Sequence, residues 1–340
     1  MKKILFFLFF LSIISAFVVV IDLPFNLPKG WPPAKYNFSN KHYTKEKILI
    51  GRLLFYDPLL SKNNTISCAS CHSPYNAFAH SDHALSHGIY DSIGTRNAPA
   101  LFNLAWQASF MWDGSIQKLD DQAVIPITHP KEMGAEMNGV LDKLNNQPMY
   151  RKLFASAYGD SVITKKHMLE SITQFLLTLV SDQSKYDSVS RHQAIFTLQE
   201  KNGYRLYKKN CAVCHQEPLF TSTGFKKNGL PYNPHLHDFG RYNVTGKVLD
   251  SFAFKVPSLR NLQYSSPYMH DGRFTKLSEV VNHYANNLSA NKYLSKELKN
   301  AIILNSNERV DLVAFLLTLS DKKFLFNPDY SFPKELLPNH

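Results

Sequence analysis

The sequence predicts a mainly α-helical protein that contains one structural unit twice, preceded by an apolar N-terminal segment. Apolar residues recur at helical spacing in several long segments, whereas alternation of β-branched residues is scarce. The pentapeptide CASCH at residues 68–72 returns as CAVCH at residues 211–215, and the two copies contain all four cysteines of the chain. A repeated motif within a helical pattern indicates an internal duplication.

The apolar segment at the N-terminus predicts export. Lys2 and Lys3 precede an apolar run at residues 4–21 that only two serines interrupt. A secretory signal has an apolar core of about 7–15 residues and a membrane-spanning helix needs about 20, so the length fits either. We therefore expect a periplasmic protein, with residues 1–22 acting as a cleaved signal peptide or as a membrane anchor.

The composition excludes some classes of protein. With 340 residues, 44% of them hydrophobic and 19% charged, the chain is long enough for two globular domains. The formal net charge is +11, but the lysines are scattered and form no basic helix or stripe, so we expect no nucleic-acid partner. A basic protein also attracts an acidic redox partner by long-range steering.

The spacing of the cysteines decides their chemistry. In an exported protein, four cysteines would ordinarily form two disulfides, and two Cys-x-x-Cys pairs could bind zinc. A histidine follows the second cysteine in both copies, and C-x-x-C-H is the attachment signature of c-type haem. We expect two covalent haems, each held by two thioethers and one imidazole. The residues are Cys68, Cys71 and His72 in one copy, and Cys211, Cys214 and His215 in the other.

The segments around the haem motifs have helical patterns. Residues 164–181, 199–216 and 308–321 carry apolar side chains at helical spacing, and the second of these leads into CAVCH. The fold class expected is therefore mainly α, with two cytochrome c-like haem domains related by internal duplication.

Five segments follow from this organisation. Residues 1–22 are the export or anchor segment, and the proline-rich residues 23–45 form a linker or wrapping arm. Residues 46–192 and 193–325 form the two haem domains, and residues 326–340 form a C-terminal tail.

A second shared signature follows each haem motif. RNAPALFNLAWQASFMWDGSIQKL (96–119) and RNLQYSSPYMHDGRFTKL (260–277) both contain Arg-Asn, then aromatic-Met-x-Asp-Gly, then Lys-Leu. We interpret the difference in spacing as a length change between the Arg-Asn and Met anchors. The alignment pairs Met111 with Met269, Trp112 with His270 and Pro126 with Tyr284.

This alignment bears on the sixth ligand of each iron. Methionine is the usual partner of histidine in electron-carrying c-type haems, which favours Met269. Met111 has the same repeat position, however, so both methionines could simply pack. Tyr284 offers an oxygen that could bind iron, whereas its counterpart is a proline without a ligating side chain. We expect Tyr284 to close the second haem, with Met269 as the alternative, and the first haem to be open.

The chain resembles the bacterial di-haem cytochrome c peroxidase family, which includes the MauG-type enzymes. The matching stretches are SCASCHSPYNAFAH, GTRNAPALFN, MWDGSIQKLDDQAVIPITHPKEMG, CAVCHQEPLF and KVPSLRNLQYSSPYMHDGRF, which lie in this order within residues 50–320. The resemblance implies that the N-terminal haem reacts with peroxide and that the C-terminal haem relays electrons.

The resemblance also implies roles for individual residues. Trp112 corresponds to a tryptophan between the haems that couples the two irons, although an ordinary core indole is the alternative. Glu132 corresponds to the acid–base carboxylate beside the bound peroxide, with a solvated surface glutamate as the alternative. Gln122 corresponds to an amide on the same side, or it packs structurally.

Other matches concern metal ligands. His87 lies near the position of a removable histidine ligand to the first iron, and His80 and His83 are further candidates. Asn97, Ser265 and Pro267 fall at the family's calcium site, where threonine is usual in place of Ser265. Amide, main-chain and water oxygens of this kind suit Ca²⁺.

The resemblance implies a peroxidase that reduces hydrogen peroxide to water with electrons from a small c-type cytochrome or copper protein. Tyr284 matches the MauG-type enzymes, which oxidise side chains of a partner protein, whereas His87 matches the reductively activated peroxidases. An electron carrier with both irons closed is the third alternative. Family members often form homodimers, although nothing in the sequence marks an interface.

Overall fold

The computed structural model describes residues 23–337, except residues 26, 40, 81, 287 and 289–293. The predicted export or anchor segment, residues 1–22, lies outside the described residues. None of the helices in the described part of the chain has both the length and the apolar character needed to cross a membrane.

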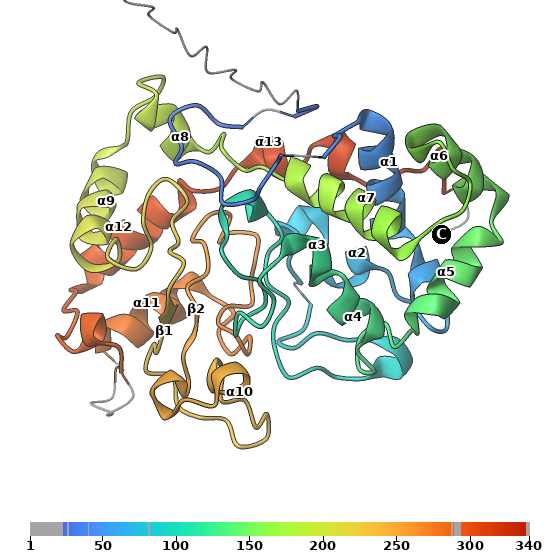
Figure 1. Ribbon diagram of the computed structural model, residues 1–340. Helices are drawn as coiled ribbons and strands as arrows, with labels where there is room; N and C mark the ends of the chain where they lie inside the picture. Colours follow the sequence, from blue (N-terminus) through green and yellow to red (C-terminus); the bar gives the residue numbers. More distant parts are fainter. Residues whose placement is uncertain are drawn as a thin grey trace, which may run out of the picture.

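The chain folds into two helical halves that lie side by side (Figure 1). The N-terminal half contains α1 (Lys45–Tyr56), α2 (Cys68–Cys71), α3 (Leu119–Gln122), α4 (Val124–Thr128), α5 (Met137–Asn145), α6 (Pro148–Tyr158) and α7 (Lys165–Thr178). The helices that follow are α8 (Lys185–Ser190), α9 (Leu198–Asn210), α10 (Tyr242–Thr245), α11 (Leu277–Asn286), α12 (Ser306–Leu317) and α13 (Lys322–Leu325).

Extended structure is sparse, as the scarcity of β patterns predicts. Strands β1 (Phe225–Lys226) and β2 (Phe254–Lys255) form one short antiparallel ladder, in which Phe225 pairs with Lys255 and Lys226 with Phe254. Single 3-10 turns lie at Pro58–Leu60, Pro74–Asn76, Ile89–Asp91, Leu104–Trp106, Val248–Asp250, Lys296–Leu298 and Pro328–Tyr330.

The helices of the predicted patterns begin at side-chain caps. Thr164 accepts a hydrogen bond from the third residue of α7, and Thr197 and Asn305 form capping boxes with glutamates at the starts of α9 and α12. These side chains satisfy main-chain N–H groups that would otherwise lack a partner. The sequence patterns at 164–181, 199–216 and 308–321 therefore correspond to α7, α9 and α12.

The same helix crossing occurs once in each half. Helix α1 packs against α7, and α9 packs against α12 (Figure 1). A Cβ atom added to Gly51 would overlap the Ser171 carbonyl, and one added to Gly203 would overlap the Asp311 carbonyl. Glycine is needed at both positions because each crossing brings the helix backbones into contact. The shared crossing supports the predicted duplication.

One detail of the predicted repeat is wrong. Asn103 and Asn261 both have left-handed backbones, with φ of 55° and 61°. The main-chain N–H of Asn103 donates to Leu179, and that of Asn261 donates to Leu319. Both asparagines stand eight residues before the repeated methionine. Asn261 therefore corresponds to Asn103 and not to Asn97, so no length change separates the anchors.

Two hydrophobic cores support the two halves. The first gathers side chains from α1, α5, α6 and α7, and the second gathers side chains from α8, α9, α11 and α12. The arm and the tail both return to the first core, where Phe38 and Leu337 are buried. Side chains of α8 belong to the second core and those of α13 to the first. The domain bounds at 46–192 and 193–325 remain a prediction.

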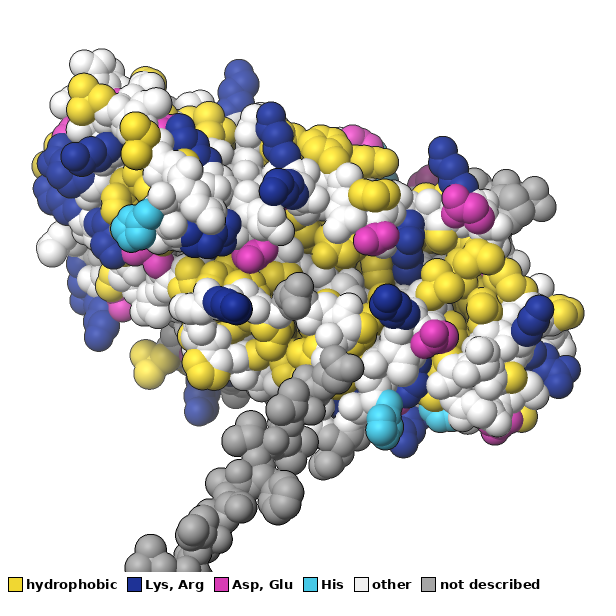
Figure 2. Space-filling model, turned by 90° about the horizontal axis from the view of Figure 1, so that it is seen from above, with side chains coloured by type: hydrophobic (Ala, Val, Ile, Leu, Met, Phe, Trp, Pro, Cys, Tyr) yellow, Lys and Arg dark blue, Asp and Glu magenta, His cyan; other side chains and the backbone are white. Residues whose placement is uncertain are grey.

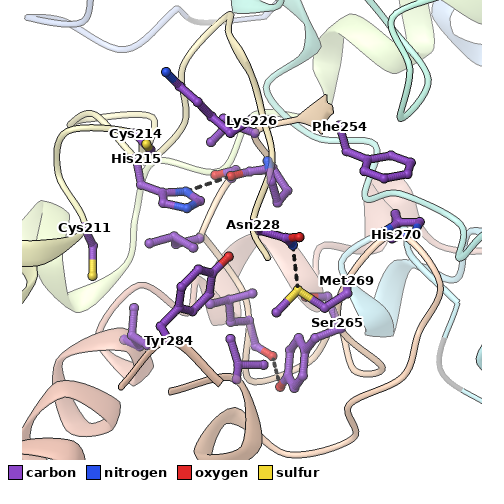
Figure 3. A pocket seen from close by; sticks show the side chains of 18 of the residues that line it. Cys211, Cys214, His215, Lys226, Asn228, Phe254, Ser265, Met269, His270 and Tyr284 are labelled. Carbon is purple, nitrogen blue, oxygen red and sulfur yellow. Dashed lines mark hydrogen bonds between the residues drawn. The ribbon is translucent and has the colours of Figure 1, made fainter. Parts of the chain in front are cut away.

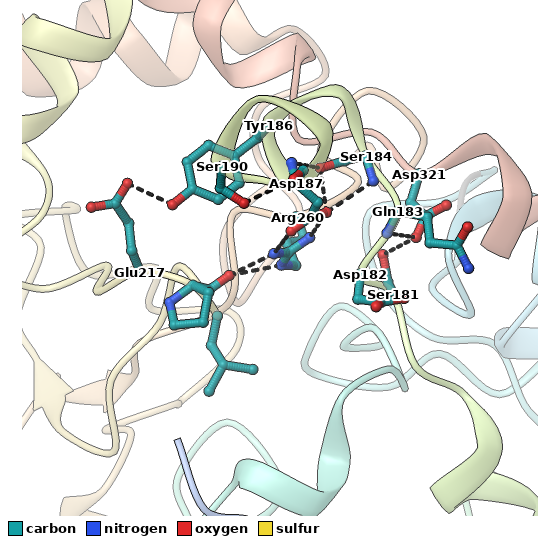
Figure 4. Close-up of polar contacts among 12 residues, drawn as sticks. Ser181, Asp182, Gln183, Ser184, Tyr186, Asp187, Ser190, Glu217, Arg260 and Asp321 are labelled. Carbon is teal, nitrogen blue, oxygen red and sulfur yellow. Dashed lines mark hydrogen bonds and ion pairs between the residues drawn. The ribbon is translucent and has the colours of Figure 1, made fainter. Parts of the chain in front are cut away.

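A buried ion pair joins α8 to the second half (Figure 4). The Arg260 guanidinium donates two hydrogen bonds of 2.7 and 2.8 Å to the Asp187 carboxylate, and the two side chains are 0% and 2% exposed. Arg260 also donates to the Pro218 carbonyl and lies over the Trp31 ring of the arm. Three segments distant in sequence therefore meet at one buried cation.

We expect Gly203→Ala to destabilise the protein by about 1–3 kcal/mol, because the methyl group meets a backbone carbonyl that has no rotamer to change. Denaturant unfolding measures the effect. Gly139→Ala is the control, since Gly139 is exposed on α5 with nothing near its Cβ, and it should stabilise by up to ~1 kcal/mol. Equal effects at the two glycines would contradict the close crossing.

We expect Asp187→Asn to cost about 3–5 kcal/mol, because it leaves the buried Arg260 without its counter-ion. Thermal unfolding of the protein measures this loss. The matched control is Lys208→Gln, which removes the partner of Glu217 from a pair whose lysine is 50% exposed. That change should cost less than ~1 kcal/mol.

Candidate functional site

The N-terminal haem motif forms the short helix α2 and the residue that ends it. Cys68 and Cys71 begin and end α2, and the His72 N–H donates to the Cys68 carbonyl at 2.9 Å. The His72 Nδ1 lies 2.7 Å from the Phe78 carbonyl oxygen. A carbonyl only accepts, so Nδ1 carries the proton and Nε2 keeps a free lone pair.

The C-terminal haem motif repeats this arrangement. The His215 N–H donates to the Cys211 carbonyl at 3.0 Å, and the His215 Nδ1 lies 3.2 Å from the Phe220 carbonyl and 3.0 Å from the Pro257 carbonyl. Figure 3 shows His215 beside Cys211 and Cys214 at the edge of a cavity. The same ring nitrogen is therefore left free in both halves.

These residues fit covalent c-type haems. All four cysteines are free, and burial raises the pKa of Cys68 and of Cys211 to about 12, so both are neutral thiols. Burial lowers the pKa of His72 and of His215 to about 4, which keeps each imidazole neutral and able to bind a metal. A fixed Nδ1–H and a free Nε2 are what an axial histidine requires.

The C-terminal cavity is about 250 Å³. Its lining is mostly apolar, which suits a porphyrin. Its lining includes Cys211, Cys214 and His215 together with side chains of α11 and α12. Tyr284 and Met269, the two predicted ligands of the second iron, both line this cavity (Figure 3). Burial raises the pKa of the Tyr284 hydroxyl, whereas its contact with Asn228 lowers it.

The two repeated methionines are bonded in similar ways. The Met269 sulfur lies 3.6 Å from the Asn228 amide nitrogen, and the Met111 sulfur lies 3.9 Å from that of Gln122. Both methionines have left-handed backbones, with φ of 75° and 66°. The similarity favours a packing role for both, although the ligand of the second iron remains a prediction. The predicted distal role of Gln122 also remains a prediction.

Trp112 lies at the junction of the two halves. It is 8% exposed and lines the C-terminal cavity, although it belongs to the N-terminal half. Its indole Nε1 donates to the Asn97 carbonyl at 2.8 Å, and its own carbonyl accepts from the Lys255 N–H at 2.8 Å. The indole is therefore held by the N-terminal half and the Trp112 main chain by the C-terminal half, although the predicted role of Trp112 in coupling the haems stays a prediction.

The three predicted calcium residues line the same cavity wall. Asn97 comes from the N-terminal half, and Ser265 and Pro267 lie two residues apart in the C-terminal half. The Asn97 side-chain nitrogen donates to the Ala84 carbonyl at 3.1 Å, so its Oδ1 is the atom suited to a cation. Among the described residues, no group of three or more His, Cys, Asp or Glu is arranged to hold a metal ion. Calcium therefore remains a prediction that depends on amide and main-chain oxygens.

Glu132 lies near the N-terminal haem motif. The Cys71 thiol is 3.3 Å from the His87 carbonyl. Two residues further along the chain, the Ile89 N–H donates to the Glu132 carbonyl at 2.8 Å. Burial raises the pKa of the Glu132 carboxyl, and nearby His129 opposes this effect. A carboxyl whose pKa is raised is suited to both give and take a proton.

The structure places all three candidate histidines together. His83 and His87 stack with ring centroids 4.2 Å apart, and His80 lies 5.5 Å from His83. His80 is the one whose charge acts on His72. The arrangement does not single out His87, so its role as a removable ligand remains a prediction.

Asn228 and Lys255 are cavity residues that the sequence does not reveal. Asn228 contacts both Met269 and Tyr284, and the Lys255 ammonium donates to Gln107 beside Trp112. Neither belongs to the haem motif or to the repeated signature with Met269. Asn103, in contrast, could have been found by aligning the two halves without a gap.

Comparisons with known proteins agree with this geometry. A family model described as di-haem cytochrome c peroxidase matches residues 45–194, and one described as cytochrome c matches residues 200–320. The methylamine utilization protein MauG of Methylorubrum extorquens is 35% identical over 305 residues, which cover 87% of this chain and 83% of that protein. The cytochrome c551 peroxidase of Nitrosomonas europaea is 33% identical over 298 residues, which cover 84% and 81%.

A solved structure supports the same conclusion. The crystal structure of a MauG-like protein associated with microbial copper homeostasis has a TM-score of 0.83 and 30% identity, covering 91% of this chain and 98% of that one. The chain therefore belongs to the di-haem cytochrome c peroxidase family, as its motifs predict, and is an oxidoreductase of the peroxidase class with two c-type haems.

Proposed function

We propose that the protein is a periplasmic peroxidase that reduces hydrogen peroxide to water with electrons from a small c-type cytochrome or copper protein. The observation that supports this most is the difference between the two halves at one repeat position. Tyr284 lines the C-terminal cavity, whereas its counterpart Pro126 offers no ligating atom. Peroxide would bind at the His72 haem, and the His215 haem would relay electrons.

When bound, the haem iron supplies peroxide binding and one-electron transfer. The protein supplies the proton chemistry. Glu132 takes a proton from the near oxygen of peroxide and gives it to the far oxygen, which leaves as water. The raised pKa of Glu132 favours this exchange because the carboxyl can hold the proton between the two steps. Two further protons and two electrons complete the reduction to two waters.

Trp112 carries the proposed electronic contact between the two haems. Its hydrogen bonds to Asn97 and Lys255 hold the indole on the wall of the C-terminal cavity. A calcium ion beside Asn97, Ser265 and Pro267 would stiffen the same wall, because these residues join the two halves. We include this ion, and the family's homodimer, in the proposal.

The proposed electron donor is a small acidic protein. Figure 2 shows lysine and arginine side chains spread over the viewed face, separated by apolar areas and by fewer acidic groups. With a net charge of +11, the surface would speed the encounter with an acidic partner, most strongly at low ionic strength.

A MauG-type function is the second candidate. Tyr284 favours it, because a hard phenolate oxygen stabilises ferric iron and lowers the reduction potential. Relatives named MauG also match as well as the named peroxidases. Oxidation of a partner protein by peroxide without any reduced cytochrome would support this function over the first.

We expect Glu132→Gln to lower the rate of peroxide-dependent oxidation of a reduced small cytochrome by about 10²–10⁴-fold, because the amide has no proton to exchange. A steady-state assay of haem-loaded protein measures the rate. Glu136→Gln, four residues away on the surface, is the matched control and should keep the rate. The peroxidase proposal fails if the wild-type protein oxidises no reduced cytochrome at all.

We expect cyanide to bind one haem of the ferric wild-type protein and both haems of Tyr284→Phe, since the substitution removes the group that closes the second iron. Electron paramagnetic resonance during a cyanide titration counts the sites. Binding at both wild-type haems would contradict the proposed asymmetry. Binding at neither haem in any redox state would instead favour a pure electron carrier.

A further inference from the structure

Asn228 lies between the two side chains that compete for the second iron (Figure 3). It follows strand β1 and lines the C-terminal cavity. The Leu230 N–H donates to the Asn228 Oδ1 at 3.3 Å, which fixes the orientation of the amide. Its nitrogen, with two hydrogens to donate, therefore faces the side on which Met269 lies.

One donor of this amide is directed at the methionine. The Asn228 Nδ2 lies 3.6 Å from the Met269 sulfur, within the range of a hydrogen bond to sulfur. A sulfur that accepts this bond has to break it before it can bind a metal. The turn that carries Met269 is also fixed, because the main chain of Tyr268 donates to Phe274 at 2.7 Å.

The Asn228 side chain lies next to the Tyr284 side chain in the same cavity (Figure 3). The main chain of Asn228 is tied to the helix that carries this tyrosine, because the buried His283 ring bonds its carbonyl at 2.9 Å. Asn228 and Tyr284 therefore keep a fixed relative position. A Met269 sulfur held by Asn228 therefore leaves the phenol oxygen of Tyr284 without a competitor on this side of the cavity.

We propose that Asn228 is a positioning residue that selects the sixth ligand of the C-terminal haem, holding the Met269 sulfur back and so leaving the Tyr284 oxygen as the ligand. This inference rests on the proposed ligand role of Tyr284. In the N-terminal half, Gln122 holds the Met111 sulfur in a similar way, but Pro126 leaves no oxygen to present. The selection would therefore operate only at the second haem.

Two substitutions of Asn228 test the proposal in the haem-loaded, full-length protein. Asn228→Leu removes the polar contacts of the side chain at similar size and keeps the main-chain bond to His283. Asn228→Asp keeps an acceptor for the Leu230 N–H but has no N–H to donate. We expect both variants to lose most of the tyrosinate-to-iron charge-transfer absorption of the ferric protein. Both should gain the near-infrared sulfur-to-iron band, and the double variant Asn228→Leu/Met269→Leu should lack that band.

The controls separate this proposal from the one it rests on. Asn233→Leu, in the same loop, should keep the wild-type spectrum, because the one hydrogen bond of the Asn233 side chain among the described residues is with the nearby His235 N–H. If both Asn228 variants keep the tyrosinate absorption while Tyr284→Phe loses it, the selection role is wrong and the ligand role of Tyr284 stands. If the wild-type protein shows no tyrosinate absorption, both are wrong. Loss of that absorption without the sulfur band would also contradict the selection.

Discussion

The structure depends on how the haem-motif histidines are held. The Nδ1 of each imidazole bonds the main-chain carbonyl of a buried phenylalanine, Phe78 for His72 and Phe220 for His215, and this bond orients the ring. Both phenylalanines have left-handed backbones, with φ of 56° and 53°, which is unfavourable for a residue with a Cβ. Close ring contacts, such as that between Phe78 and Phe55, hold them in this conformation. Packing of each core therefore fixes the axial imidazole.

The duplication explains why much of the fold could be predicted. A haem motif leaves few choices for the chain around it, and the helix crossings at Gly51 and Gly203 follow the same geometry. The helical patterns and the two motifs were therefore sufficient for the fold class and the haem residues. The incorrect pairing of Asn97 with Asn261 arose because an Arg-Asn dipeptide is a weaker signal than spacing. The equal distances from Asn103 and Asn261 to the repeated methionines are what the structure preserves.

The site beyond the haem motifs was harder to predict for a physical reason. Asn228 lies outside the haem motif and outside the repeated signature, so neither pattern directs attention to it. Its importance comes from contacts with Met269 and Tyr284, which are 41 and 56 residues away. The three histidines of the first half pose the opposite difficulty. They are close in sequence and their rings stack, so neither spacing nor geometry shows which of them is the better candidate ligand of the first iron.

The junction between the halves holds Trp112 and its neighbours from both sides. Arg96 donates to Asp238 at 2.6 Å and to Asp113 at 2.7 Å, so one cation joins two carboxylates, one from each half. The Asn97 N–H donates to the His270 carbonyl at 2.7 Å, next to the ring that replaces Trp112 in the repeat. Main-chain bonds thus reach Trp112 and its neighbours from both sides. These contacts tie the two halves together at this point. The proposed electron transfer across Trp112 would therefore take place over a fixed distance between the haems. The two haems would then differ in the side chains next to the sixth position of each iron, and not in the helical fold that surrounds them.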